Sequence, residues 1–239
     1  WRLPDYQPCV KYFVHRVTTS GGRTCGEGGV RWPQQTYQPN SSQQRRFQSR
    51  PASFNNLTEV SIMPEADKFR VRHARSDGDD AQFIMSAFDS TIPYLASIGA
   101  GAMWGEKPFS EKDGFEGETV ESIQKSERDD EPLRVFIAEV GPGAAAEQGT
   151  AQPVRVGSAM VREDSLPSYI TDREEMKPEV DGAKDYLFLE VVISDYRTGP
   201  LHRGAGAALI EAIKHYGRER NKKTLYVDCW AGNGAKLNR

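Results

Sequence analysis

Apolar and polar positions late in the chain change from one period to another, and this change predicts a strand followed by a helix. Residues 187–193 are apolar except for Glu190 and rich in branched side chains, which predicts a strand buried on both faces. After a linker, Leu209, Ile213 and Tyr216 repeat at helical spacing on one face. The rest of the sequence is organised around this strand–turn–helix unit.

Similar patterns predict further elements on both sides of the unit. Alternating or continuous apolar runs predict strands, and apolar residues three or four positions apart predict helices. The expected strands are Phe69–His73, Leu133–Val140, Val154–Val161 and Thr224–Trp230, and helices are expected to begin near Asp80, Tyr94, Glu118 and Gly204 and again at the end of the chain. Residues 163–184 are charged and contain prolines, so we expect a surface loop with one helical turn.

Three local features refine these expectations. The acidic run Asp77–Asp80 offers an N-cap for the first helix. Pro93 is expected to interrupt that helix, because proline lacks an amide hydrogen and clashes with the preceding turn. Gly157 lies in the middle of a predicted strand, which indicates either a bulge or a close approach of another backbone segment.

The first part of the chain has a different composition. Gln, Ser, Asn, Arg, Pro and Gly dominate between Gly21 and Asn56, and such a segment buries too little apolar surface to offset its ordering entropy. Residues 1–62 carry eight Lys or Arg against three Asp or Glu. The first methionine is Met63. We therefore predict a disordered, non-native leader over residues 1–65, with translation starting at Met63, and one domain over 66–239.

Composition excludes several classes of function. The net charge is −3, and the predicted domain is more acidic still, which argues against nucleic-acid binding. No apolar run is long enough to span a membrane. The three cysteines are scattered among four widely spaced histidines, so we expect no metal site and reduced thiols in a cytoplasmic or nuclear protein.

The turn before the predicted helix has the chemistry of an anion site. Gly204 and Gly206 have no Cβ, so a phosphate can approach the unpaired amides of the first helical turn. A dinucleotide loop requires a third glycine where Leu209 stands, and a P-loop requires a lysine where Ala205 stands. Neither of these two nucleotide motifs fits the turn.

The same turn resembles a known loop. Gly204-Ala205-Gly206, with Leu209 three residues later, resembles the pyrophosphate-binding loop of the GNAT superfamily of acyl-CoA N-acyltransferases. Leu201 departs from the pattern, since it stands where the family has Gln or Arg, and Arg197 is the expected basic substitute. The strand segments around it resemble the second to fifth strands of that family. The resemblance covers roughly residues 66–239 and is specific from Leu187 onward.

The resemblance implies a fold and a cofactor site. The implied fold is α+β, with a mixed, mostly antiparallel sheet flanked by helices, whose fourth and fifth strands splay apart. Acetyl-CoA is the implied co-substrate, and a small-molecule or peptide amine is the implied acceptor. The residues implied to bind the cofactor are Val191, Val192, Ile193, Arg197, His202, Arg203, Gly204, Ala205, Gly206, Ala207 and Asn233. A plain helix N-cap is the alternative role for Asn233.

The sequence indicates the catalytic residues less directly than the cofactor-binding residues. Glu190 is the one charged residue inside the buried strand, so it is the first candidate for the base that deprotonates the amine, and Asp228 is the second. A solvent-facing or hydrogen-bonded carboxylate is the alternative for Glu190. A backbone amide near Val191 to Ile193 is implied to polarise the thioester carbonyl. The expected activity is N-acetyl transfer by direct attack, and the alternative is a protein or fragment that binds CoA without turnover.

The family pattern continues beyond Arg239 with a helix that carries a proton-donating tyrosine and with further strands. We therefore expect a C-terminally truncated fragment whose fifth strand, Thr224–Trp230, has an unprotected edge. The oligomeric state stays open, with a dimer among the alternatives.

Overall fold

The computed structural model describes residues 12–18, 68–129, 131–141, 152–230 and 232. All of them belong to one compact unit, which comprises residues 1–21 and 64–239. Asn233 and the helix expected at the end of the chain lie outside the described residues, as does most of the leader predicted over residues 1–65.

A six-stranded sheet forms the centre of this unit. Its strands lie in the order β1-β6-β5-β4-β3-β2, and every neighbouring pair is antiparallel except β5 with β6. The strands are β1 (Tyr12–Thr18), β2 (Phe69–His73), β3 (Leu133–Val140), β4 (Val154–Glu163), β5 (Tyr186–Ser194) and β6 (Thr224–Trp230). The mixed, mostly antiparallel sheet that the sequence predicted is therefore confirmed.

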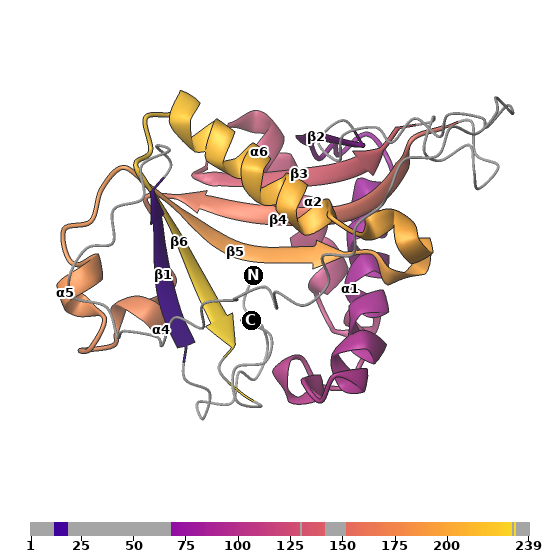
Figure 1. Cartoon of the computed structure of the whole chain (residues 1–239), viewed down its shortest axis with the longest axis horizontal. Helices are drawn as coiled ribbons and strands as arrows, with labels where there is room; N and C mark the ends of the chain where they lie inside the picture. Colours follow the sequence, from indigo (N-terminus) through magenta and orange to yellow (C-terminus); the bar gives the residue numbers. More distant parts are fainter. Residues whose placement is uncertain (1–11, 19–67, 130, 142–151, 231, 233–239) are drawn as a thin grey trace, which may run out of the picture. The chain divides into compact units, whose positions relative to one another are not determined.

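β5 and β6 are paired along only part of their length. The ladder joins Tyr186 with Thr224 and ends at the pair Leu189 and Val227. Beyond this pair the two strands diverge, as Figure 1 shows for the arrows labelled β5 and β6. The splayed strand pair that the resemblance implied is thus present, and we call the region beyond the last pair the fork.

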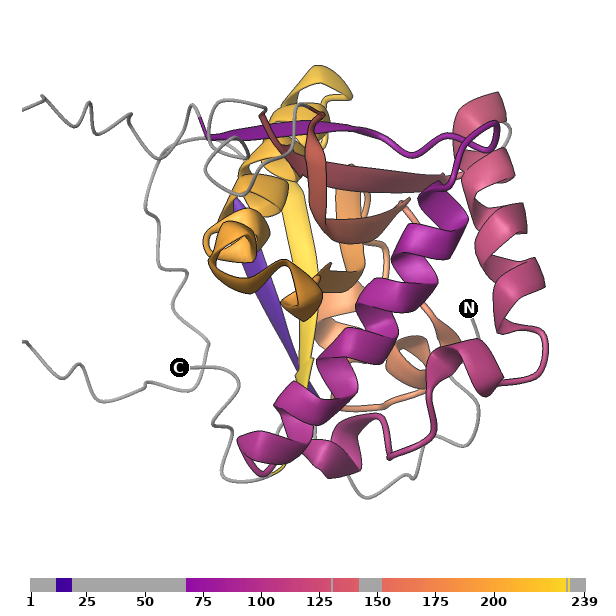
Figure 2. The ribbon, with the colours of Figure 1, turned by 90° about the vertical axis from the view of Figure 1, so that its right-hand side faces the viewer.

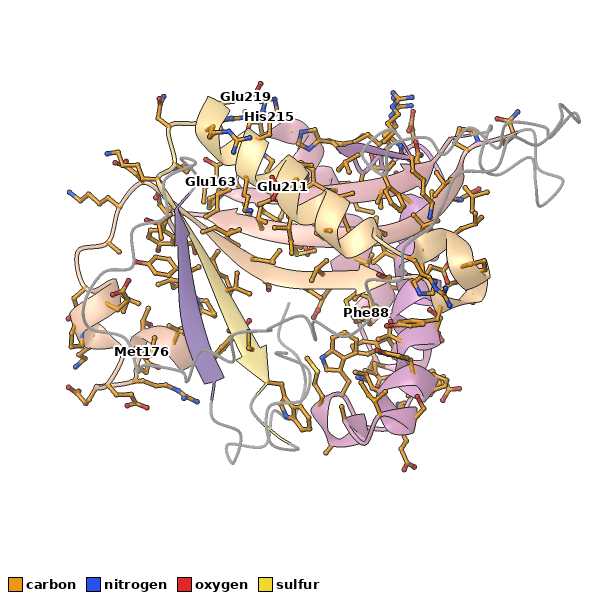
Figure 3. The ribbon with its side chains drawn as sticks, in the orientation of Figure 1. Phe88, Glu163, Met176, Glu211, His215 and Glu219 are labelled. Atoms are coloured by element: carbon orange, nitrogen blue, oxygen red, sulfur yellow. The ribbon has the colours of Figure 1, made fainter. Side chains whose placement is uncertain are left out.

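Helices cover both faces of the sheet. Figure 2 shows α6 on one side of it and α1 and α2 on the other. The helices are α1 (Asp80–Ser97), α2 (Phe115–Arg128), α4 (Ser168–Thr171), α5 (Lys177–Val180) and α6 (Ala205–Glu219). On the α6 face, Leu209 and Ile213 are buried against strand residues such as Leu187, which confirms the helical face predicted from the sequence. Glu211, His215 and Glu219 project from α6 away from the sheet (Figure 3).

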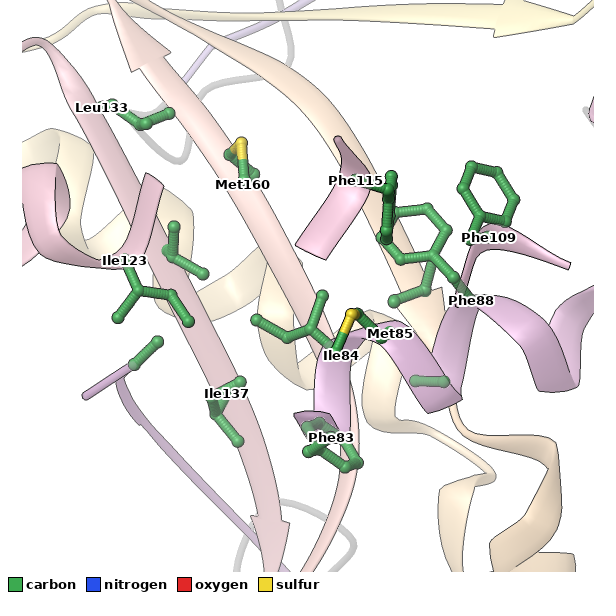
Figure 4. Packing of buried hydrophobic residues seen from close by; sticks show 14 of the residues in the cluster. Phe83, Ile84, Met85, Phe88, Phe109, Phe115, Ile123, Leu133, Ile137 and Met160 are labelled. Carbon is green, nitrogen blue, oxygen red and sulfur yellow. The ribbon is translucent and has the colours of Figure 1, made fainter. Parts of the chain in front are cut away.

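The core beneath α1 and α2 is rich in aromatic residues. The rings of Phe88, Phe109 and Phe115 contact one another with centroids 4.7–5.3 Å apart, and Trp104 joins them. Figure 4 shows how this group continues along the sheet through Ile123 and the strand residues. This packing fixes α1 against the strands.

The prediction that Pro93 interrupts the first helix is wrong. α1 continues through Pro93 to Ser97. Pro93 is exposed, whereas Ile92 and Leu95 are buried, and Leu95 packs against Trp230 at the end of β6. Burial of these side chains offsets the hydrogen bond that proline removes.

The N-cap expected from Asp77–Asp80 is also corrected. Asp79 occupies the cap position of α1 without a side-chain hydrogen bond to the helix. Asp80 is buried and accepts hydrogen bonds from the guanidinium groups of Arg72 and Arg155, at 2.6–3.0 Å, and from the amide of Arg75. The acidic run therefore anchors α1 to the sheet by ion pairs instead of capping it.

The expected open edge of Thr224–Trp230 is likewise corrected. β1 pairs with β6 in antiparallel register along all seven residues, from Tyr12 opposite Trp230 to Thr18 opposite Thr224. A strand therefore lies inside the segment expected to be disordered, and it satisfies the backbone groups that the edge would otherwise expose.

Gly157 makes the close backbone approach that its position in a strand indicated. A Cβ added there would lie 2.8 Å from the carbonyl oxygen of Ile193 and 3.4 Å from side-chain atoms of Ala205 and Leu209. The ladder between β3 and β4 also shifts register beside it. We expect Gly157→Ala to lower the free energy of unfolding by about 1–3 kcal/mol, because the methyl group overpacks this junction.

Urea unfolding measures this effect. Gly117→Ala is the control, because Gly117 lies on α2 with no atom within 4 Å of an added Cβ. Alanine should stabilise that helix slightly. Equal stability of Gly157→Ala and the unchanged chain would contradict the expectation.

Candidate functional site

The N-terminus of α6 provides a row of backbone amides that have no acceptor within the helix. Gly204 precedes the helix with φ of 91°, a left-handed conformation that glycine adopts without strain. No side chain caps the helix, and the amide of Ala208 is bonded to the carbonyl of Gly204. The amides of Ala205, Gly206 and Ala207 therefore have no acceptor within the helix and present the positive end of its dipole.

This row of amides is positioned by the buried contacts described for Gly157. Ala205 and Leu209 are buried against β4, opposite the end of β5. Gly206, in contrast, has no atom within 4 Å of an added Cβ. The helix therefore approaches the sheet closely on one side and leaves open space beside Gly206 on the other.

The loop between β5 and α6 explains why an apolar residue, Leu201, stands where the family pattern has Gln or Arg. The loop contains the 3₁₀ segment η5 (Tyr196–His202), in which Leu201 is buried in the core cluster under α6. Arg197, the expected basic substitute, donates two side-chain hydrogen bonds of 2.8 Å to the buried carboxylate of Asp195. These bonds raise the pKa of Arg197, and the negative charge of Asp195 offsets part of the positive charge of the guanidinium group. Its predicted contact with the cofactor remains a prediction.

His202 and Arg203 lie immediately before the anion loop. The imidazole of His202 packs on the ring of Tyr196 at a centroid distance of 4.7 Å, and burial lowers its pKa. Arg203 is exposed, and its carbonyl oxygen accepts a hydrogen bond of 3.3 Å from the ammonium group of Lys68. Lys68 is a basic residue near the loop that the sequence analysis missed, because no spacing rule connects it with Gly204.

The fork exposes one backbone unit of β5. The amide of Asp195 donates to Val156 on β4, and the carbonyl of Ile193 faces Gly157 on the same strand. Backbone groups alternate in direction along an extended strand, so the amide and carbonyl of Val192 point away from β4, toward the side where β6 has diverged. Of the three residues expected there, Val191 and Ile193 face the α1 core, while the side chain of Val192 is exposed.

Glu190 is the unpaired residue of a β-bulge. Met160 pairs with Val191 and Val161 pairs with Leu189, so Glu190 has no counterpart on β4. Its carboxylate accepts hydrogen bonds from Arg162, at 2.7 Å from Nε and 3.4 Å from Nη2. Glu190 is thus a hydrogen-bonded carboxylate, the alternative that the sequence left open, and its partner Arg162 was not predicted.

A second carboxylate lies on β6. The Oδ2 atom of Asp228 accepts a hydrogen bond of 3.0 Å from the phenol of Tyr169 on α4. Burial raises the pKa of Asp228 to about 6, and the charge of Glu190 contributes to the rise. Cys229 is partly buried, and burial also raises the pKa of its thiol.

The structure thus brings most of the predicted residues to one end of the sheet. Val191–Ile193 are on the fork side of β5, and Gly204–Ala207 form the start of α6, which follows β5 through η5. Among the described residues, no group of three His, Cys, Asp or Glu side chains is placed to hold a metal ion. In the same part of the chain, no helix is both long enough and apolar enough to cross a membrane.

Comparison with known protein families and with curated proteins finds no match to this sequence. Among solved structures, an N-acetyltransferase from Staphylococcus aureus Mu50 is similar over 71% of this chain and 78% of its own, with 15% identity and a TM-score of 0.42. FemX is similar over 66% of this chain and 44% of its own, with 8% identity and a TM-score of 0.41.

Proposed function

We propose that this protein is an acyltransferase that transfers an acetyl group from acetyl-CoA to a primary amine. The observation that carries the proposal is the fork between β5 and β6 beside the uncapped N-terminus of α6. The amides of Ala205 to Ala207 suit a pyrophosphate. The backbone unit of Val192, which points away from β4, suits an extended amide chain, which pairs with a strand edge as an added strand does.

The chemistry follows from the same geometry. An amide of β5 in the fork donates to the carbonyl oxygen of the thioester and stabilises the negative charge that develops there. The amine nitrogen attacks the carbonyl carbon, the carbon–sulfur bond breaks, and the thiolate takes up a proton. A carboxylate beside the fork accepts the proton that the nitrogen loses, and Glu190 and Asp228 are the two candidates.

Two measurements test this function. Calorimetry with acetyl-CoA, NAD and ATP should show binding of acetyl-CoA alone. A thiol-release assay with a panel of primary amines, from ethanolamine to lysine-containing peptides, should show turnover. Binding without thiol release would favour the alternative of a CoA-binding protein that lacks activity. Binding of NAD or ATP in place of acetyl-CoA would refute the assignment.

A further inference from the structure

Two carboxylates flank the point at which β5 and β6 separate. Leu189 and Val227 form the last pair of the parallel ladder, and Glu190 and Asp228 are the residues that follow them. Val227 packs on the α6 face, so the alternation of side chains places Asp228 on the opposite face.

These two carboxylates have different partners. Both oxygens of Glu190 accept hydrogen bonds from the guanidinium group of Arg162. Asp228 accepts a hydrogen bond from the neutral phenol of Tyr169, and among the described residues no cation forms an ion pair with it. A proton on Glu190 would break an ion pair, whereas a proton on Asp228 only weakens a hydrogen bond from a neutral donor.

The surroundings of Asp228 agree with this difference. Among the side chains that the structure describes, the ionisable groups that act on it are Glu190 on β5, Tyr169 on α4 and the neighbouring Cys229, with Arg162 bonded to Glu190. Burial raises its pKa, the hydrogen bond from Tyr169 lowers it, and the charge of Glu190 raises it, with a result of about 6. A base whose pKa lies near the working pH transfers protons most effectively.

We propose that Asp228 accepts the proton of the attacking amine and that Tyr169 is a positioning residue that orients its carboxylate. This role rests on the proposed acetyl transfer. The acceptor enters as an ammonium ion, and Asp228 takes one proton from its nitrogen. The resulting amine forms the new carbon–nitrogen bond, and its second proton moves to the departing thiolate to give the free thiol of CoA. Asp228 then releases its proton to solvent, which balances the reaction.

The pH dependence of thiol release tests the role. For the full chain with its best amine, kcat/KM should fall below about pH 6 along an acidic limb that reports Asp228. Asp228→Asn should lower kcat by about 10²–10⁴-fold and abolish this limb, while acetyl-CoA binding measured by calorimetry stays within a few-fold. A limb that persists in Asp228→Asn would assign the proton to another group.

Two further variants move the limb in opposite directions. Tyr169→Phe removes a hydrogen bond that favours the ionised carboxylate, so the limb should shift to higher pH. Glu190→Gln removes a negative charge, so the limb should shift to lower pH. A purely structural role for these residues would change stability without moving the limb. If Glu190 is the base, Glu190→Gln abolishes the limb, and the role of Asp228 is overturned.

The outcomes separate this role from the proposed function. Absence of thiol release by the unchanged chain with every amine overturns both together. Turnover with an unaltered profile in Asp228→Asn overturns the role of Asp228 alone. If Asp228→Asn fails to fold, as judged by thermal unfolding, the opposite shifts of Tyr169→Phe and Glu190→Gln decide the question.

Discussion

Replacement of Gly206 by aspartate is expected to abolish measurable acetyl-CoA binding while leaving the protein at least as stable as before. An added side chain meets no atom within 4 Å at this position. A carboxylate in the first turn of a helix stabilises the helix by about 0.3–1 kcal/mol. The same charge repels a pyrophosphate and competes for its amides, and each lost hydrogen bond to a charged group costs about 1.5–3 kcal/mol.

Calorimetry and thermal unfolding of the same variant measure the two effects separately. Gly206→Ala is the matched control, because it adds a methyl group into the same open space without charge. It should bind acetyl-CoA within a few-fold of the unchanged chain and unfold at a slightly higher temperature. Normal binding by a folded Gly206→Asp variant would place the pyrophosphate elsewhere.

Loss of the carboxylate at Asp80 is expected to cause the largest change in stability. Its side chain is 3% exposed and forms ion pairs with Arg72 and Arg155, at 2.6 and 3.0 Å. Asp80→Ala leaves these cations without their main partner in a partly buried site. Breaking such a pair costs about 3–5 kcal/mol, which corresponds to a fall in Tm of roughly 6–20 °C for a domain of this size.

The dependence of stability on pH gives a second measurement of the same group. Burial by itself would raise the pKa of Asp80, but hydrogen bonds from Arg72, the amide of Arg75 and Arg155 outweigh burial and lower it. Because the pKa of Asp80 is lower in the folded chain than in the unfolded chain, its ionised carboxylate stabilises the folded state above about pH 4. This stabilisation is lost as the pH falls through the pKa of Asp80 in the folded state. Urea unfolding at pH 7 and at pH 3 should differ less for Asp80→Ala than for the unchanged chain.

Sequence periodicity predicted the elements whose side chains repeat regularly. Phe69–His73, Leu133–Val140 and Thr224–Trp230 have the bounds expected from their apolar runs, and α6 buries the face that its spacing indicated. The splayed strand pair came from the resemblance of the glycine loop to the GNAT family and not from any periodicity. A local motif thus predicted a feature of the whole sheet.

The structure differs from the sequence predictions where contacts between residues far apart in the sequence decide the structure. Pro93 is a local helix-breaking signal, but the burial of Leu95 against Trp230 is a tertiary effect that no local rule contains. The run Tyr12–Thr18 is rich in aromatic and branched residues, a strand signal that the surrounding polar composition obscured. Tyr169 gave no signal, because its partner Asp228 lies on a strand far along the sequence.

The pairing of β1 with β6 has a consequence for the order of folding. The paired residues are about 200 positions apart, and closing so long a loop costs entropy that contacts between sequence neighbours avoid. The β2–β6 part of the sheet, whose strands pair with partners nearer in sequence, should therefore assemble before β1 docks. Pulsed hydrogen exchange during refolding should show amides of β4 and β5 protected earlier than those of β1, and simultaneous protection would indicate that the terminal strand takes part in the folding nucleus.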